Sequence, residues 1–238
     1  MQVEDIGRFE LLFTDLIEHI MHVHFVSPRY TSEKLEPPFY RDMVDVFEDR
    51  VRGWLIDPAL VLLRVNRLSV PAVILCVNYF EAIEIYISGE DSARRSKEFF
   101  KRGFKRVFSV RGQNDEVSDW ISTALYESMR CGFAHEGMAK NGVNFSLVRS
   151  EPILVSYPKK NGSPDLFSKP AAFIVNPEVF VKGVEAHFSR YVSDLRRSRD
   201  PVLSANFKRA AELKWALNEP GRVIGMTEKE FFSGGRVD

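Results

Sequence analysis

Apolar residues recur at three- and four-residue spacing along most of the chain, which is the pattern of amphipathic helices. This spacing predicts one helix over about 3–24 and another over about 40–54, with a proline-containing link between them. Asp57 and Pro58 fit the N-cap and first turn of a short helix that ends near Val65. The inward positions predicted for the second helix are Met43, Val46, Phe47 and Trp54.

The most apolar segment predicts a central helix over about 69–89, with Gly89 as its left-handed C-terminal cap. The next helix is predicted over about 92–110, where a stripe of phenylalanines alternates with cations. Because the phenylalanines follow helical spacing, we expect them to be buried in the core. A further helix is predicted over about 116–138.

The pattern then changes to short apolar runs that are typical of strands, over about 145–148, 153–157 and 172–175. A polar stretch over about 159–170 is predicted to be a loop. Helices follow over about 177–197 and 202–217. The sequence thus predicts one mainly α domain over 1–238: a helical core over about 1–142, a small β element over about 143–176, and C-terminal helices over about 177–218.

Composition bears on the number of domains and on the cellular compartment of the protein. The chain has 238 residues with 33 basic and 33 acidic side chains, which suits one large domain. Its two cysteines indicate a reducing compartment. Glu81 and Glu84 interrupt the most apolar run before it reaches the length of a membrane span, and the first residues are acidic where a signal peptide is basic. We therefore expect a cytoplasmic protein without a membrane segment.

Charge is distributed unevenly along the chain. Residues 1–50 carry eleven acids and five bases, a net charge of −6, whereas residues 91–111 carry eight bases and two acids, a net charge of +6. A local excess of cations can attract a polyanion even when the whole chain is neutral. The candidate RNA-binding residues are Arg94, Lys97, Lys101, Arg102, Lys105 and Arg106.

One segment, Tyr126 to Gly137, combines residue types that suit phosphodiester chemistry. It places Arg130 and His135 five positions apart near the predicted end of a helix. The arginine fork matches phosphate oxygens, and histidine exchanges protons near neutral pH. Five helical positions separate the two side-chain directions by about 140°. A two-fold dimer joined along this helix would line one cleft with two arginines and two histidines.

The run Arg-Cys-Gly-Phe-Ala-His-Glu-Gly, preceded by the apolar helix and the basic helix, resembles the signature of HEPN domains. The resemblance implies a helical bundle that dimerises through the motif helices and cleaves RNA, tRNA among the candidates, without a metal or other cofactor. It assigns catalysis to Arg130 and His135. It also implies a toxin or antiviral defence role, with an antitoxin or other partner protein.

The sequence departs from that signature at Cys131, where active members commonly carry asparagine or another polar residue. This departure favours an alternative, a catalytically inactive interaction or nucleotide-binding module of the same fold. Cys131, Glu81 and Glu136 are candidates for a supporting role, and Glu81 could pair with Arg130 or orient His135. A second cluster, Glu18, His19, His22 and His24, lacks the further ligands of a tetrahedral metal site, so we predict no metal.

Overall fold

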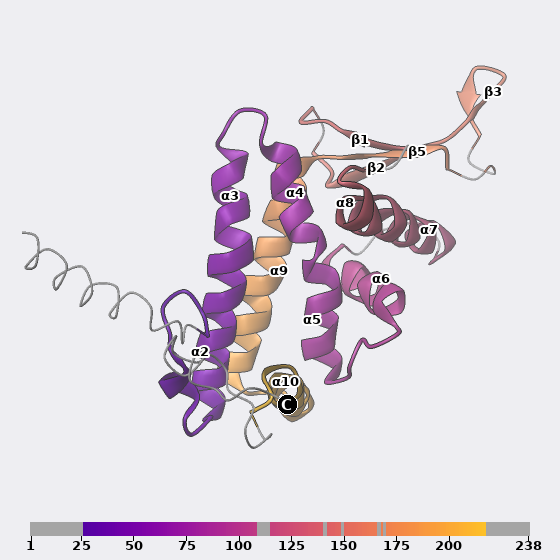
Figure 1. The fold of residues 1–238 in the computed structure, drawn as a ribbon. Helices are drawn as coiled ribbons and strands as arrows, with labels where there is room; N and C mark the ends of the chain where they lie inside the picture. The colour runs from indigo at the N-terminus through magenta and orange to yellow at the C-terminus, as the bar shows by residue number, and fades with distance from the viewer. Residues whose placement is uncertain are drawn as a thin grey trace, which may run out of the picture.

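Helices form most of the protein in its computed structural model (Figure 1), which confirms the mainly α class. The structure describes residues 26–108, 115–139, 142–148, 150–165, 168 and 170–217. The helix predicted over about 3–24, the histidines within it and the tail from Gly221 lie outside these residues.

After a short 3-10 helix, η1 (Ser32–Leu35), the chain forms one continuous helix. Its parts are α2 (Tyr40–Val51), a π-helical turn η2 (Arg52–Ile56) and α3 (Asp57–Leu63). Helix α3 begins at Asp57 with Pro58 in its first turn, but the predicted N-cap role of Asp57 is wrong, because Asp57 has helical backbone angles and its N–H bonds to Arg52 within the π turn. The extra residue of the π turn also shifts the helix face, so Trp54 is 50% exposed rather than inward.

The central helix predicted over about 69–89 is interrupted near its middle. It consists of α4 (Ser69–Val77) and α5 (Tyr79–Ser88), which meet at Asn78. The Asn78 side chain donates to the carbonyl of Ile74 at 3.2 Å, a local bond of the kind that competes with regular helix. The predicted left-handed cap at Gly89 is confirmed, with φ of 71°.

Helix α6 (Ser96–Val107) packs very closely against α5. The approach depends on Gly103, since a Cβ atom built there would lie 1.9 Å from the carbonyl oxygen of Phe80. The neighbouring rings Phe99, Phe100 and Phe104 are buried, as their helical spacing predicted. This close contact brings the cations of α6 within reach of the acidic side chains of α5.

The motif helix, defined here as residues 115–136, contains a second π turn. It consists of α7 (Asp115–Leu125), η3 (Tyr126–Arg130) and α8 (Cys131–Glu136), and it ends at Gly137 with φ of 71°. These bounds confirm a helix that the sequence predicted over about 116–138. The π turn falls on the residues that lead into the Arg130 position.

A small sheet follows the motif helix, with strand order β1-β5-β2. Strand β1 (Val143–Phe145) runs parallel to β5 (Ala172–Val175), and β2 (Ile153–Ser156) runs antiparallel to it. The Trp120 and Phe173 rings, 6.2 Å apart, join this sheet to α7. The predicted extension of the first strand to Val148 is wrong, because β1 ends at Phe145 and both Leu147 and Val148 are exposed.

Part of the predicted polar loop forms a short hairpin, β3 (Lys159–Lys160) with β4 (Ser163–Pro164). Asn161 and Gly162, both with positive φ, form its turn. In Figure 1 this hairpin projects away from the helices.

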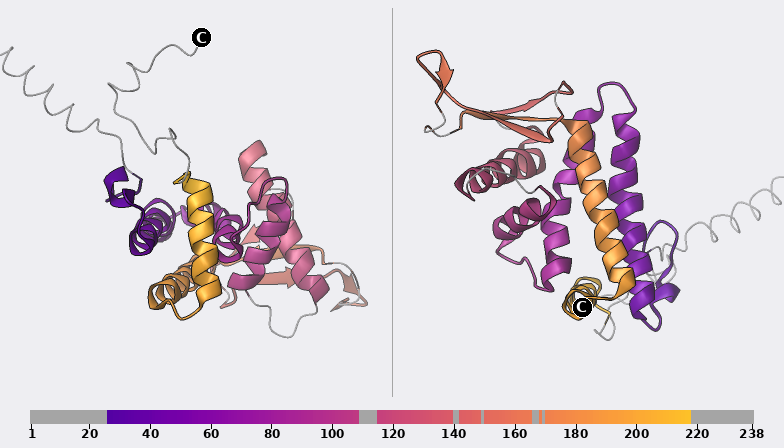
Figure 2. Two further views of the ribbon diagram at one scale, coloured as in Figure 1. Left: turned by 90° about the horizontal axis from the view of Figure 1, so that it is seen from below. Right: turned by 180° about the vertical axis from the view of Figure 1, so that it is seen from behind.

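Helices α9 (Pro177–Arg197) and α10 (Pro201–Trp215) complete the bundle. The side chains of Asn176 and Asp200 accept backbone N–H groups and cap the two helices. Helix α9 lies along α2, α3 and α4 (Figure 2), and an aromatic core closes between them. Phe47 lies at the centre of that core, in ring contact with Tyr86, Phe188, Tyr191 and Phe207.

One stretch, Ser69–Ser88, is long and apolar enough to cross a membrane by length and composition alone. Half of this stretch is buried inside the bundle, where it serves as the core pair α4 and α5. It therefore gives no clear membrane signal.

Candidate functional site

The end of the motif helix presents Arg130 and His135 to the surface. Arg130 is the last residue of η3, with a side chain that is 33% exposed, and His135 is exposed in the last turn before Gly137. The intervening residues are α-helical, so the two side chains leave the helix about 140° apart, as the spacing predicts. Within the described residues, His135 makes no hydrogen bond or ion pair.

Glu81, on α5, holds the Arg130 side chain. Its Oε2 lies 3.8 Å from Nη2 of Arg130, and its Oε1 accepts a hydrogen bond of 2.9 Å from the buried Ser92 hydroxyl. The Arg130 and Glu81 side chains are 33% and 17% exposed, so water screens this ion pair in part. Of the two roles considered for Glu81, the structure contains the pairing with Arg130.

Cys131 has a partner that the sequence did not suggest. The π turn brings Cys131 next to Tyr126, five positions earlier, and the backbone N–H of Cys131 bonds to the Tyr126 carbonyl. Burial, followed by the adjacent Cys131 thiol, raises the pKa of Tyr126 above its usual range. Arg130 opposes this shift. The thiol thus belongs to a polar group with Tyr126, Arg130 and Glu81.

Glu136, the last candidate for a supporting role, follows His135 and is exposed at the end of α8. His135 and Glu136 both lie closer to the C-terminal end of the helix than the contact between Arg130 and Glu81. A single chain therefore presents an anchored arginine and a separate, exposed histidine.

The cations of α6 form ion pairs with carboxylates on neighbouring elements. Lys97 pairs with Glu127 of the motif helix at 2.6 Å. Lys101 and Lys105 share Asp119, each at 2.6 Å, and their hydrogen bonds hold the pKa of Asp119 below its usual range. These pairs fix α6 against the motif helix.

Arg102 and Arg106 share a second carboxylate, that of Glu84 on α5. Glu84 is fully buried, and Arg102 Nη2 lies 2.6 Å from its Oε1. Arg106 binds the same carboxylate through two nitrogens. Glu98, which also pairs with Arg102, and Glu84 together balance Arg102 and Arg106. Asp119 balances only one of its two lysines, so the α6 surface keeps an excess positive charge after pairing.

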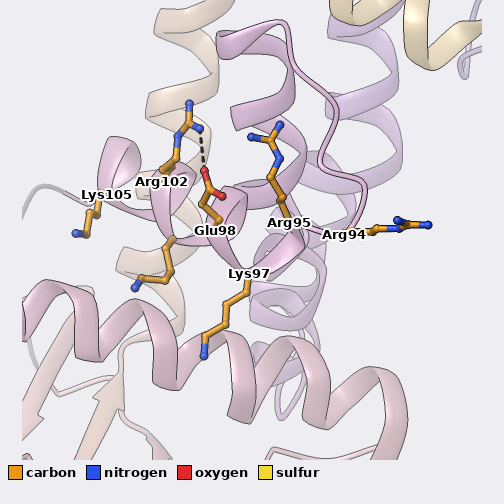
Figure 3. Close-up of a pocket in the computed structure, with 7 residues that line it drawn as sticks. Arg94, Arg95, Lys97, Glu98, Arg102 and Lys105 are labelled. Atoms are coloured by element: carbon orange, nitrogen blue, oxygen red, sulfur yellow. Dashed lines mark hydrogen bonds and ion pairs between the residues drawn. The ribbon is translucent and has the colours of Figure 1, made fainter.

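The outer face of α6 is hollowed (Figure 3). The hollow has a volume of about 470 Å³ and is lined by six cations and one acid: Arg94, Arg95, Lys97, Lys101, Arg102, Lys105 and Glu98. Arg94 points away from the other side chains in Figure 3 and is exposed, with φ of 63°. Lys97 extends toward the motif helix, so the hollow adjoins that helix through the Lys97–Glu127 pair. Of the predicted RNA-binding residues, five line this hollow and Arg106 does not.

Comparison with protein-family models, with curated proteins and with solved structures finds no match for this chain. The case for a function therefore depends on the residues themselves. Ser92 and Tyr126, which surround Arg130, were missed in the sequence because their proximity depends on the α5–α6 turn and on the π turn. Neither feature has a recognisable sequence signal.

Proposed function

We propose that the protein is a metal-independent endoribonuclease of the HEPN type, which acts in the cytoplasm as a homodimer. The observation that carries the proposal is the end of the motif helix, where Glu81 pairs with a partly exposed Arg130 and His135 is exposed five residues later. An anchored arginine is suited to a phosphate, and an exposed histidine with no competing partner is suited to proton transfer.

In the proposed site, Arg130 of one chain acts with His135 of a second chain. Because the two side chains diverge by about 140° on one helix, two motif helices side by side are the simplest way to bring them to one phosphate. The histidine takes the proton of a ribose 2′-hydroxyl, and the 2′-oxygen forms a bond to phosphorus. The bond from phosphorus to the 5′-oxygen breaks, and that oxygen receives the proton. The products are a 2′,3′-cyclic phosphate and a 5′-hydroxyl.

Arg130 stabilises the negative charge that grows on the phosphate oxygens during this step. The hollow on α6 supplies the excess positive charge that holds the flanking backbone. Since Lys97 links this hollow to the motif helix, an RNA strand bound there passes close to the reacting phosphate.

The direct test incubates the purified protein with total RNA and with tRNA in EDTA. We expect cleavage that leaves cyclic phosphate ends. His135→Ala is expected to lower the rate by about 10²–10⁴-fold and Arg130→Ala by about 10²–10³-fold. Arg209→Ala, an exposed arginine on α10, is the matched control and is expected to leave the rate unchanged.

A second candidate is the inactive module of the same fold, favoured by Cys131, a weak hydrogen-bond former directly after Arg130. It predicts a folded dimer that leaves RNA intact and captures a partner protein, such as an antitoxin, through the motif helix. Cleavage that both Arg130→Ala and His135→Ala remove would rule it out. A toxin or defence role is part of the first proposal, and it predicts that expression of the wild type, but not of His135→Ala, arrests growth.

A further inference from the structure

A small cavity opens beside Arg130, at the interruption between α4 and α5. Its volume is about 150 Å³, and its walls come from both sides of the interruption and from the motif helix: Ile74, Val77, Asn78, Met129, Arg130 and Phe133. It is distinct from the hollow on α6, which shares none of these residues. The cavity thus adjoins the proposed phosphate-binding residue on a surface that the proposed function does not use.

The lining is apolar at the base and polar at the rim. Met129 and Val77 are buried in the core, while Ile74 and Phe133 are partly exposed. Pockets for drug-sized ligands have volumes from about 300 Å³ upward, so this cavity has room for one planar ring system rather than a whole nucleoside. An apolar slot with one aromatic wall is the environment in which an unpaired base is held in RNA recognition.

Asn78 supplies the polar edge of this slot. One N–H of its amide is committed to the Ile74 carbonyl, which fixes the side chain in place. Its carbonyl oxygen and its second N–H remain available, because the residue is exposed. An amide that offers one acceptor and one donor side by side matches the N6 amino group and N7 of adenine.

We propose that this cavity, the base pocket, receives an unpaired nucleobase next to the phosphate bound by Arg130, with adenine preferred. The proposal rests on the proposed function for the position of the phosphate. The Phe133 ring stacks on the base, Met129 and Val77 contact its far edge, and the Asn78 amide reads its N6 and N7. The pocket therefore makes Asn78 the residue that determines where a strand is cut.

The test measures binding separately from cleavage. In the His135→Ala background, short single-stranded RNAs with one central adenine, guanine, cytosine or uracil among uridines are titrated by fluorescence anisotropy. We expect the adenine strand to bind about tenfold more tightly than the others, which is the usual discrimination of an amide that makes two hydrogen bonds. Adding Asn78→Ala should remove this preference and leave the affinity for the other strands unchanged.

Two further variants test whether the preference depends on the pocket. Ile74→Trp, at a partly exposed wall, fills the pocket and should abolish the adenine preference while circular dichroism and the melting temperature stay close to those of the parent. Asn66→Ala, an exposed asparagine away from the pocket, is the matched control and should keep the preference. An equal affinity for all four strands in the parent, or an adenine preference that survives both Asn78→Ala and Ile74→Trp, would overturn the base pocket.

The outcome is distinguishable from that of the proposed function. If the wild type cleaves RNA and the pocket variants change neither the base preference nor the cut sites, the pocket is wrong and the ribonuclease stands. If the wild type cleaves nothing and the adenine preference is lost in Asn78→Ala, the pocket stands as a nucleobase-binding site and the catalytic proposal fails.

Discussion

Helix α5 carries two glutamates one turn apart, and the two differ in what their arginines do. Glu84 is fully buried and is shared by Arg102 and Arg106, which fasten α6 to α5. Glu81 is near the surface, and a single arginine, Arg130, lies 3.8 Å from it. The first arrangement neutralises a fully buried carboxylate with two arginines, whereas the second pairs one arginine with a carboxylate that water can still reach.

Burial of the acid, rather than the presence of an ion pair, therefore separates a structural arginine from a candidate catalytic one. A buried carboxylate that loses its cations is left as an unpaired charge in a poorly solvated site. A carboxylate near water is rehydrated when its partner leaves, so the loss costs little. The arginines of Glu84 are thus required for the fold, while the arginine of Glu81 is available for a substrate.

The strongest test of this difference removes both arginines of Glu84. The double variant Arg102→Ala with Arg106→Ala is expected to lower the free energy of unfolding by about 3–5 kcal/mol, because it leaves the Glu84 carboxylate buried without a cation. The matched control is Lys101→Ala with Lys105→Ala, which strips the half-exposed Asp119 of its two cations in the same geometry and should cost about 1 kcal/mol or less. Urea unfolding measures both, and equal losses would contradict the role assigned to burial.

The stability of the fold should also depend on pH, through the protonation of His187 on α9. Burial, followed by the charges of Arg190 and Arg106, lowers the pKa of His187 to about 4, and its Nδ1 lies 2.8 Å from the Tyr79 hydroxyl. The unfolded chain takes up this proton near pH 6.5 and the folded chain only near pH 4. The contribution of His187 to the free energy of unfolding should therefore be fully present above pH 6.5 and should decrease as the pH falls toward 4. The loss should be at most about 3 kcal/mol, and smaller than that because the ring is only partly buried.

Replacing His187 with glutamine should flatten that part of the stability profile. Urea unfolding between pH 4 and pH 7 gives the comparison, and a profile that keeps its slope in His187→Gln would contradict the assignment to this residue.

The close approach of α6 to α5, which places both arginines over Glu84, depends on Gly103. Gly103→Ala is expected to destabilise the protein by about 1–3 kcal/mol, since the new Cβ meets the backbone of Phe80, which cannot move aside. Gly183→Ala is the control, because its Cβ would meet the Phe108 ring, a side chain that can shift. Melting temperatures that fall equally in the two variants would argue against a rigid contact at Gly103.

We expect the smallest effect on stability from a substitution at Glu81. Glu81→Gln removes the charge that orients Arg130 but keeps an oxygen for Ser92, so the free energy of unfolding should change by about 0.5 kcal/mol or less. The proposed function then predicts that kcat falls about tenfold with KM nearly unchanged, because the arginine loses its orientation in the transition state. A large loss of stability would place Glu81 in the same structural class as Glu84.

The sequence predicted most helices well because their apolar spacing decides which face is buried. The cap at Gly89 was also predictable, since it depends on local chemistry. The errors fall where the backbone departs from an ideal helix. The π turn after Val51 hid the continuity of α2 and α3 and turned Trp54 outward, and the interruption at Asn78 divided a helix whose apolar pattern is continuous.

The candidate site was predictable only in part for the same reason. Arg130 and His135 were found through a short signature, but the contacts around them depend on long-range packing. The Glu81–Arg130 pair joins residues 49 positions apart, and Ser92 reaches Glu81 only because the chain turns between α5 and α6. Periodicity correctly marked the phenylalanines of α6 as core, yet it could not tell which of its cations would be shared with buried acids.

Mixing two inactive variants shows whether Arg130 and His135 act together across two chains. Arg130→Ala and His135→Ala are purified separately, mixed in equal amounts under conditions that allow subunits to exchange, and assayed for RNA cleavage in EDTA beside the wild type. Random pairing yields heterodimers in about half of the dimers, each with one complete site of two. We expect that cleavage, absent from each variant alone, returns to about a quarter of the wild-type rate. A mixture that exchanges subunits and stays inactive, while the wild type cleaves, would contradict the shared site.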